Sequence, residues 1–142
     1  MDEKQKRITS FRDLHVYQAT YSTCIKIMTE LLPKLPDSEK YDLKDQLGRS
    51  VKAIPRLIAE GYAKRHQKAG FQKYLDDAMA ECNETIVGLE MCRDIYKTHM
   101  PNFPLDEFID LYDKAGRQLY NLAGSWSKFK TERHNRLPKR AS

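Results

Sequence analysis

Histidine is the side chain that most often carries metal or proton-transfer chemistry near neutral pH. The chain has four, His15, His66, His99 and His134, far apart in the sequence. None stands three or four residues from a carboxylate, which is the Glu-x-x-His arrangement of di-iron bundles. No HExxH motif, phosphate-binding loop, nucleophile elbow or zinc-type spacing occurs. We therefore expect no catalytic residue, no metal site and no cofactor, and we predict that the chain is not an enzyme.

Two carboxylates, Glu60 and Glu84, stand beside apolar positions. A partly buried carboxylate needs a cationic partner, and Arg49 lies close enough to an apolar stripe to reach Glu84 from a neighbouring helix. One interpretation of these residues is a general-acid site. We favour a structural pair between Arg49 and Glu84 that fixes the register of two helices.

Basic side chains carry the strongest chemical signal. They cluster through positions 49–73 and again from position 117 onward. Such clusters neutralise phosphates without reading a base sequence. The alternative is a solvated helix face, because a helix dipole favours acids first and bases last, which is the order found after Leu105. The predicted nucleic-acid-binding residues are Arg49, Lys52, Arg56, Lys64, Arg65, Lys68, Lys73, Arg117, Lys128, Lys130, Arg133, Arg136, Lys139 and Arg140.

The positive charge is concentrated at the C-terminal end. The chain carries a formal net charge of +5. Most of this charge lies after Phe129, where five basic residues accompany a single acid, Glu132. A basic tail on a nearly neutral body indicates a polyanion contact at one end. We therefore divide the chain into a flexible leader (1–10), a folded body (11–129) and a basic tail (130–142).

Apolar residues recur at alternating spacings of three and four in four segments, which is the period of a helix with one buried face. The segments begin after Ser10, after Asp42, near Gly70 and after Pro104. No strand-like alternation or hairpin signal occurs. Short connections favour antiparallel neighbours. The sequence therefore predicts an all-α fold, an up-down-up-down antiparallel four-helix bundle.

The first two segments carry specific local signals. Ser10 and Asp13 form a capping-box pattern. Pro55 removes a backbone donor inside the second segment, so we expect a kink or a break there. In the first segment the expected buried stripe is Leu14, Tyr17, Tyr21, Cys24, Met28 and Leu31.

More apolar side chains flank the stripes than a monomeric bundle normally exposes. We therefore expect a homo-oligomer formed through the first and third helices. The alternative is that the bundle wraps these residues more deeply. They are Val16, Ala19, Ile25, Ile27 and Leu32 in the first helix, and Val87, Met91 and Ile95 in the third.

Cysteine usage and hydropathy indicate the compartment. Cys24, Cys82 and Cys92 fall on apolar stripes and form no CxxC pair, so we expect buried thiols in a reducing environment. No apolar run approaches the roughly 18 residues of a spanning helix. The charged N-terminus is not followed by an apolar stretch and is unlike a signal peptide. We expect a cytoplasmic protein without membrane contact.

The second segment resembles a known family. Its residues Gln46-Leu47-Gly48-Arg49-Ser50, Ile54-Pro55 and Ile58-Ala59-Glu60-Gly61-Tyr62, with the opening Phe11-Arg12-Asp13-Leu14-His15-Val16-Tyr17, are similar to bacterial four-helix bundle proteins encoded by intervening sequences within large-subunit ribosomal RNA genes. The resemblance runs from Phe11 to Leu89 and implies that Pro55 is a tolerated family feature. Departures from the family pattern occur at Gly48, Glu81 and Ile86.

The end of the chain resembles a related branch. Gly116-Arg117, followed by Gly124-Ser125-Trp126 and a basic tail, is similar to the accessory variability determinant protein of diversity-generating retroelements. This resemblance implies a homopentamer that binds RNA or DNA and partners a reverse transcriptase. The alternative that stays open is a protein-interaction module of the rRNA intervening-sequence type with no direct nucleic-acid role.

Overall fold

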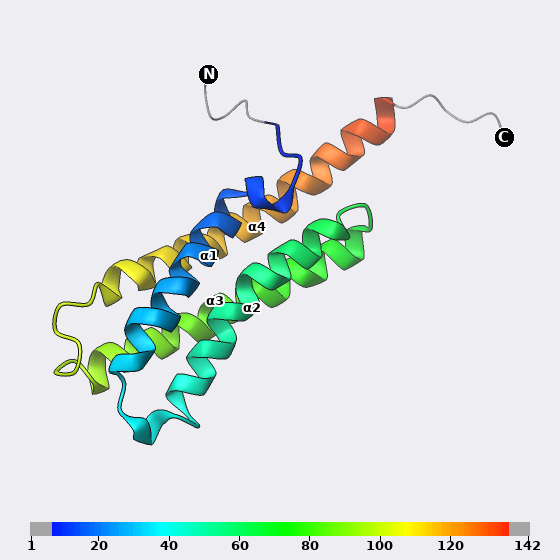
Figure 1. Cartoon of the computed structure of the whole chain (residues 1–142). Helices are drawn as coiled ribbons and strands as arrows, with labels where there is room; N and C mark the ends of the chain where they lie inside the picture. Colours follow the sequence, from blue (N-terminus) through cyan, green and yellow to red (C-terminus); the bar gives the residue numbers. More distant parts are fainter. Residues whose placement is uncertain (1–6, 137–142) are drawn as a thin grey trace.

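The structure, a computed structural model, describes the backbone of residues 7–136 and the side chains of residues 7–125. Four long helices dominate it (Figure 1): α1 (His15–Lys26), α2 (Leu43–Ala63), α3 (Lys68–Ile95) and α4 (Leu105–Arg136). The described residues contain no strand, which confirms the predicted all-α fold. Among the same residues no helix is both long and apolar enough to cross a membrane. Short pieces flank α1, namely η2 (Phe11–Asp13), η3 (Ile27–Leu31), η4 (Leu32–Lys34) and η5 (Asp37–Glu39).

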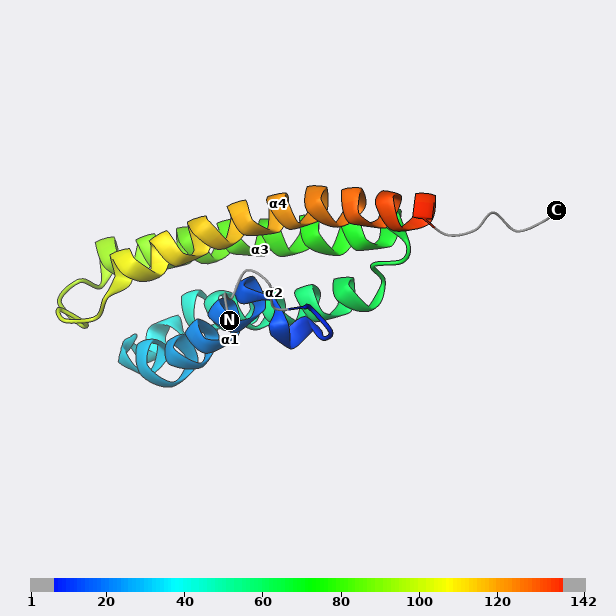
Figure 2. The ribbon, with the colours of Figure 1, turned by 90° about the horizontal axis from the view of Figure 1, so that it is seen from above.

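The helices run up and down in two layers. α2 packs along α3, α3 packs along α4, and α1 contacts both α2 and α4. Figure 2 shows α3 and α4 in one layer and α1 with α2 in the other. α1 and α3 therefore occupy diagonally opposite corners of an antiparallel four-helix bundle, as predicted.

The predicted capping box is present at the entry to the bundle. Asp13 Oδ2 accepts a hydrogen bond from the backbone N–H of Ser10 at 3.0 Å, and Ser10 Oγ accepts from the N–H of Arg12 at 3.2 Å. The capped turn is the short η2, whereas α1 begins at His15. The cap therefore orients the chain before α1 and does not itself start the long helix.

The buried face of α1 differs from the predicted stripe. Tyr21, expected inside, is 51% exposed, while Thr20, Thr23 and Ile27 are buried. The Thr20 hydroxyl donates to the carbonyl of Val16 at 2.7 Å, so its polar group is satisfied within the helix. The stripe prediction is wrong at Tyr21 because buried threonines occupy core positions that a purely apolar pattern leaves blank.

α2 runs through Pro55 as one continuous helix, so the break that the sequence allowed does not occur. Pro55 itself is buried, and its neighbours Ile54 and Ile58 are 0% and 1% exposed. A proline inside a helix costs about 3 kcal/mol. Burial of this apolar run against the core offsets that cost.

α2 and α3 pack tightly where Gly88 faces Leu47. A Cβ at position 88 would lie 2.7 Å from Leu47 Cδ2 and 2.8 Å from Leu47 Cγ, so a larger residue does not fit without movement. Nearby on the same two helices, the buried Thr85 hydroxyl donates to Ser50 Oγ at 2.9 Å. These two contacts fix the register of α2 against α3.

The core holds three free, buried cysteines, as predicted. Burial raises the pKa of the Cys82 and Cys92 thiols to about 12, so both stay protonated at neutral pH. Tyr112 is also fully buried, and its hydroxyl makes no hydrogen bond to any described residue. Among the described residues, no group of three or more His, Cys, Asp and Glu side chains is placed to hold a metal ion.

Candidate nucleic-acid interface

The up-down topology brings two basic segments to one end of the bundle. The α2–α3 turn and the last turns of α4 lie at the same end in both views (Figures 1 and 2). The register agrees, because Met79 and Asn83 of α3 line the same surface groove as Gly116 and Tyr120 of α4. In an antiparallel pair, one residue back along α3 corresponds to one residue forward along α4. Starting from the level of this groove, the first residue of α3, Lys68, therefore lies beside the backbone of Thr131 of α4.

The α2–α3 turn carries four cations, and we call Lys64, Arg65, Lys68 and Lys73 the basic tip. The turn closes tightly through a hydrogen bond from the N–H of Gln67 to the carbonyl of Lys64 at 2.9 Å. Arg65 is half-buried and the other three cations are exposed. The tip therefore combines a defined backbone with accessible charge.

Two cations of the basic tip pack against tyrosine rings. The Arg65 guanidinium lies 4.1 Å from the centroid of the Tyr62 ring and donates to the Tyr62 carbonyl at 2.9 Å. Lys64 Nζ lies 5.3 Å from the centroid of the Tyr74 ring. Cation–π contacts orient a cation without neutralising it. Both side chains are thus positioned while keeping their full charge.

Within the described residues, no ion pair neutralises the basic tip. None of the ion pairs within the described residues includes a tip residue. The first turn of α3 holds no acidic residue, and Gln67 at its N-cap makes no side-chain capping hydrogen bond. The positive end of the α3 dipole therefore adds to the charge of the side chains.

Two other predicted phosphate contacts are already paired within their own helices. Arg49 Nη1 lies 3.5 Å from Asp45 Oδ2, and Arg117 pairs with Asp113. The predicted pair between Arg49 and Glu84 is therefore wrong. Asp45 stands one turn from Arg49 on α2 and captures it locally. The buried contact between Thr85 and Ser50 fixes the register that this pair was expected to fix.

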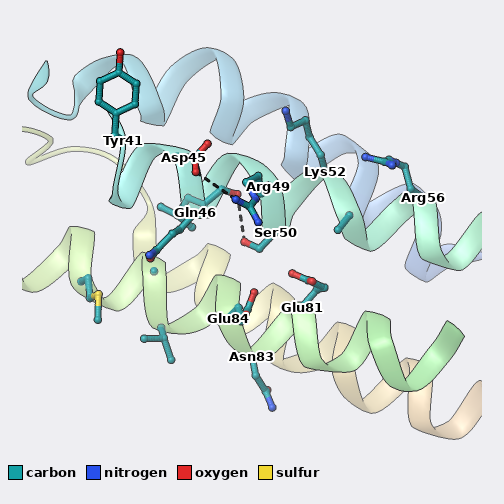
Figure 3. Close-up of a pocket in the computed structure, with 15 residues that line it drawn as sticks. Tyr41, Asp45, Gln46, Arg49, Ser50, Lys52, Arg56, Glu81, Asn83 and Glu84 are labelled. Carbon is teal, nitrogen blue, oxygen red and sulfur yellow. Dashed lines mark hydrogen bonds and ion pairs between the residues drawn. The ribbon is translucent and has the colours of Figure 1, made fainter. Parts of the chain in front are cut away.

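Arg49, Lys52 and Arg56 line a groove of about 880 Å³ between α2 and α3, which we call the α2–α3 groove. Its other wall carries Glu81 and Glu84, and both carboxylates are directed toward α2 in Figure 3. Burial, followed by the hydrogen bond and the charge of Glu84, raises the pKa of Glu81, and Arg49 opposes the shift. A phosphate in this groove would meet both carboxylates.

The remaining predicted residues lie on or after the last turns of α4. The helix continues past Phe129, the expected end of the folded body, to Arg136. Outside the described residues are the side chains of Lys128, Lys130, Arg133 and Arg136 and the whole of Lys139 and Arg140.

Comparison with known proteins decides the family. A family model described as 23S rRNA-intervening sequence protein matches residues 12–121, which is most of the chain. The chain belongs to this family. The matched region includes both the basic tip and the α2–α3 groove. No curated protein and no solved structure matches the chain significantly.

This intervening-sequence protein also exposes two apolar rows. On α3, Val87, Met91 and Ile95 are 51%, 46% and 63% exposed, which agrees with the excess apolar surface predicted there. On α1 the exposed row consists of Tyr21 and Ile25. The other apolar residues that were predicted to flank the stripe of the first helical segment are instead covered by the bundle itself. Ala19 is half-buried, and Val16, Ile27 and Leu32 are buried.

Two features of the candidate site were not predicted from the sequence. Tyr62 stands three residues before Arg65, and this helical spacing is a signal that could have revealed their contact. The acidic wall of the α2–α3 groove carries no comparable signal, because Glu81 and Glu84 face α2 only in the register that Gly88 and Leu47 impose.

Proposed function

We propose that this intervening-sequence protein is a non-enzymatic, homo-oligomeric accessory protein that binds RNA or DNA and partners a reverse transcriptase of a diversity-generating retroelement. The observation that carries the nucleic-acid part is the basic tip. Its cations are supported by tyrosine rings and belong to no ion pair of the described residues, and they lie at the same end as the basic stretch of α4.

In this proposal the tip neutralises phosphates and reads no bases. Arg65 covers one face of the Tyr62 ring, which is itself buried, and Lys64 covers one face of the Tyr74 ring, so little ring surface is left for a base to stack on. Affinity then follows charge and counterion release. If the tip cations neutralise one phosphate each, the slope of log K against log salt is about −3.6 on a duplex, and steeper with contacts from α4. A slope near zero would remove the mechanism.

Charge reversal at the tip tests the proposal directly. The variant Lys64→Glu, Arg65→Glu, Lys68→Glu should lose about a hundredfold or more in RNA affinity at low salt while keeping its oligomeric state. Fluorescence anisotropy with a labelled RNA duplex measures the first quantity and light scattering measures the second.

A matched control makes the same change in net charge at the opposite end of the bundle. It reverses three exposed lysines, Lys26, Lys40 and Lys97. Its RNA affinity should fall far less than that of the tip variant. Equal losses in the two variants would mean that only net charge matters and would remove the tip as a site.

Self-association is supported by the two exposed apolar rows, which lie on diagonally opposite corners of the bundle. A row on α1 of one copy can cover the row on α3 of the next, and such head-to-tail contacts build a closed ring when the rotation between neighbours closes. The pentamer is the ring size that the resemblance implies. Met91→Glu should convert the oligomer to a monomer in light scattering, and a variant that stays oligomeric would move the contact elsewhere.

The reverse transcriptase partner is supported by the resemblance around Gly116 and Gly124. A Cβ at either position would meet no described atom within 4 Å, so packing among the described residues does not require glycine there. Each helical glycine nevertheless costs about 1 kcal/mol relative to alanine, a cost that a closely packed partner would explain. Gly116→Leu with Gly124→Leu should abolish co-purification with the reverse transcriptase and leave RNA binding intact.

A second candidate function is a protein-interaction module with no nucleic-acid role. The exposed rows and the α2–α3 groove favour it, because both suit protein partners. The two functions separate in one titration: this candidate predicts weak RNA binding that the tip variant leaves unchanged.

A further inference from the structure

The α2–α3 groove presents opposite charges that do not meet. Glu81 and Glu84 are directed toward α2, while Lys52 and Arg56 lie along the outer edge of that helix (Figure 3). No ion pair of the described residues joins the two walls, and Arg49 pairs along its own helix. Charges of both signs therefore remain available to a ligand.

The floor of the groove fixes the distance between its two walls. Leu47 fills the space against Gly88, and the hydrogen bond from Thr85 to Ser50 ties the helices just beneath the charged rims. An exposed ion pair contributes at most about 1 kcal/mol, which is too little to repack a buried contact of this kind. The groove is therefore preformed and not an accident of side-chain conformation.

The chemistry of the walls selects the ligand. Phosphates and purely acidic peptides are repelled by Glu81 and Glu84, and purely basic peptides by Lys52 and Arg56. At one end Val87 and Met91 add exposed apolar surface to the lining. The lining on α2 extends from Asp45 to Arg56, about 16 Å at 1.5 Å per residue, which accommodates about three helical turns.

We propose that the α2–α3 groove docks one amphipathic helix of a partner protein that carries both an acidic and a basic edge. Its acidic edge lies along Lys52 and Arg56, its basic edge along Glu81 and Glu84, and its apolar face on Val87 and Met91. A neighbouring copy docked through its α1 row would cover the same two residues, so the partner helix and that copy compete for this end of the groove. This is helix-in-groove recognition in which the charged edges set the direction of the bound helix. The proposal does not depend on nucleic-acid binding at the basic tip.

A display library of helical peptides, randomised at their surface positions and selected on the full-length protein, provides the probe. The recovered peptides should carry acids along one edge and bases along the other. A recovered peptide, labelled and titrated by fluorescence anisotropy, should bind the variant Glu81→Lys, Glu84→Lys at least tenfold more weakly. RNA affinity at the tip should not fall in that variant.

The matched control Glu107→Lys, Asp110→Lys makes the same charge change on exposed positions of α4 and should bind the peptide as the parent does. Glu81 is half-buried, so a second variant on fully exposed positions, Lys52→Glu with Arg56→Glu, guards against misfolding and should show the same loss.

Three results would overturn the groove proposal. The first is a set of purely acidic peptides whose binding is lost on reversal of the tip. The second is peptides that bind the groove variants and the α4 control equally, or none above background. The third is peptides that copy the outer face of α1, which would make the groove a contact between copies. The RNA affinity of the tip variant tests the nucleic-acid proposal, and the peptide affinity of the groove variants tests the groove proposal. Each proposal can therefore fail while the other stands.

Discussion

Replacing Gly88 by alanine tests the packing that holds α2 and α3 in register. The added Cβ would lie 2.7 Å from Leu47 Cδ2 and 2.8 Å from Leu47 Cγ, whereas carbon atoms in contact rest about 3.5–4.0 Å apart. Leu47 is 1% exposed, so it has little space to turn into. The two helices would have to separate by up to about 1 Å to restore normal contact.

Two opposing effects set the magnitude. Overpacking of this kind costs about 1–3 kcal/mol, and alanine in place of glycine inside a helix contributes about 1 kcal/mol. Gly116→Ala isolates the second effect, because a Cβ there meets nothing within 4 Å. We expect Gly116→Ala to raise the free energy of unfolding by about 1 kcal/mol. Gly88→Ala should leave it about 1–3 kcal/mol below the Gly116→Ala value.

Urea unfolding followed by far-UV circular dichroism, at one fixed protein concentration, measures both variants. The double variant Leu47→Ala, Gly88→Ala should be less destabilised than the sum of its two single changes, because the smaller residue 47 makes room for the new methyl group. Equal stability of Gly88→Ala and Gly116→Ala would refute the close approach of α2 to α3.

Three further outcomes are expected. Tyr112→Phe removes a buried hydroxyl that has no hydrogen-bond partner among the described residues and should raise the free energy of unfolding by about 1 kcal/mol or more in the same urea assay; a less stable variant would reveal a hidden partner. Ser50→Ala should cost only about 1 kcal/mol, because the single Thr85 hydroxyl proton can then be donated to the carbonyl of Glu81 on its own helix, and a loss several times larger would contradict this. The hydrogen bond from Tyr96 lowers the pKa of Glu39 below its unfolded value. The resulting stability is therefore present above about pH 4.5 and lost as the pH falls through the folded pKa; Tyr96→Phe should flatten the fall in urea midpoint below that pH, and an unchanged profile would count against the contact.

Helix number and order could be predicted because the core follows the helical period over long segments. Leu75, Ala78, Cys82 and Leu89 on α3 are at most 1% exposed, as their spacing requires. α1 was less predictable. Thr20 and Thr23 take core positions, and a threonine hydroxyl that bonds its own helix leaves no trace in an apolar pattern.

In the candidate site, too, local features could be predicted from the sequence and features that depend on tertiary packing could not. The cations of the α2–α3 turn are consecutive or nearly so in sequence, so their clustering needs only the turn itself. The sequence prediction paired Arg49 with the distant Glu84 and overlooked Asp45, which stands one helical turn before Arg49. The local Asp45 wins because a pair within one helix needs no help from tertiary packing. The α2–α3 groove depends on interhelical distances that no spacing encodes.

A single two-fold-related neighbour cannot cover apolar rows on opposite corners of one bundle. In the proposed head-to-tail ring, each subunit contributes its α1 row to the contact with one neighbour and its α3 row to the contact with the other. A subunit with polar residues at positions 87, 91 and 95 would still dock through its α1 row. It would have no apolar row on α3 to bind the next subunit. A small admixture of such a subunit would open the rings it entered, so the defect would be dominant over an excess of intact copies.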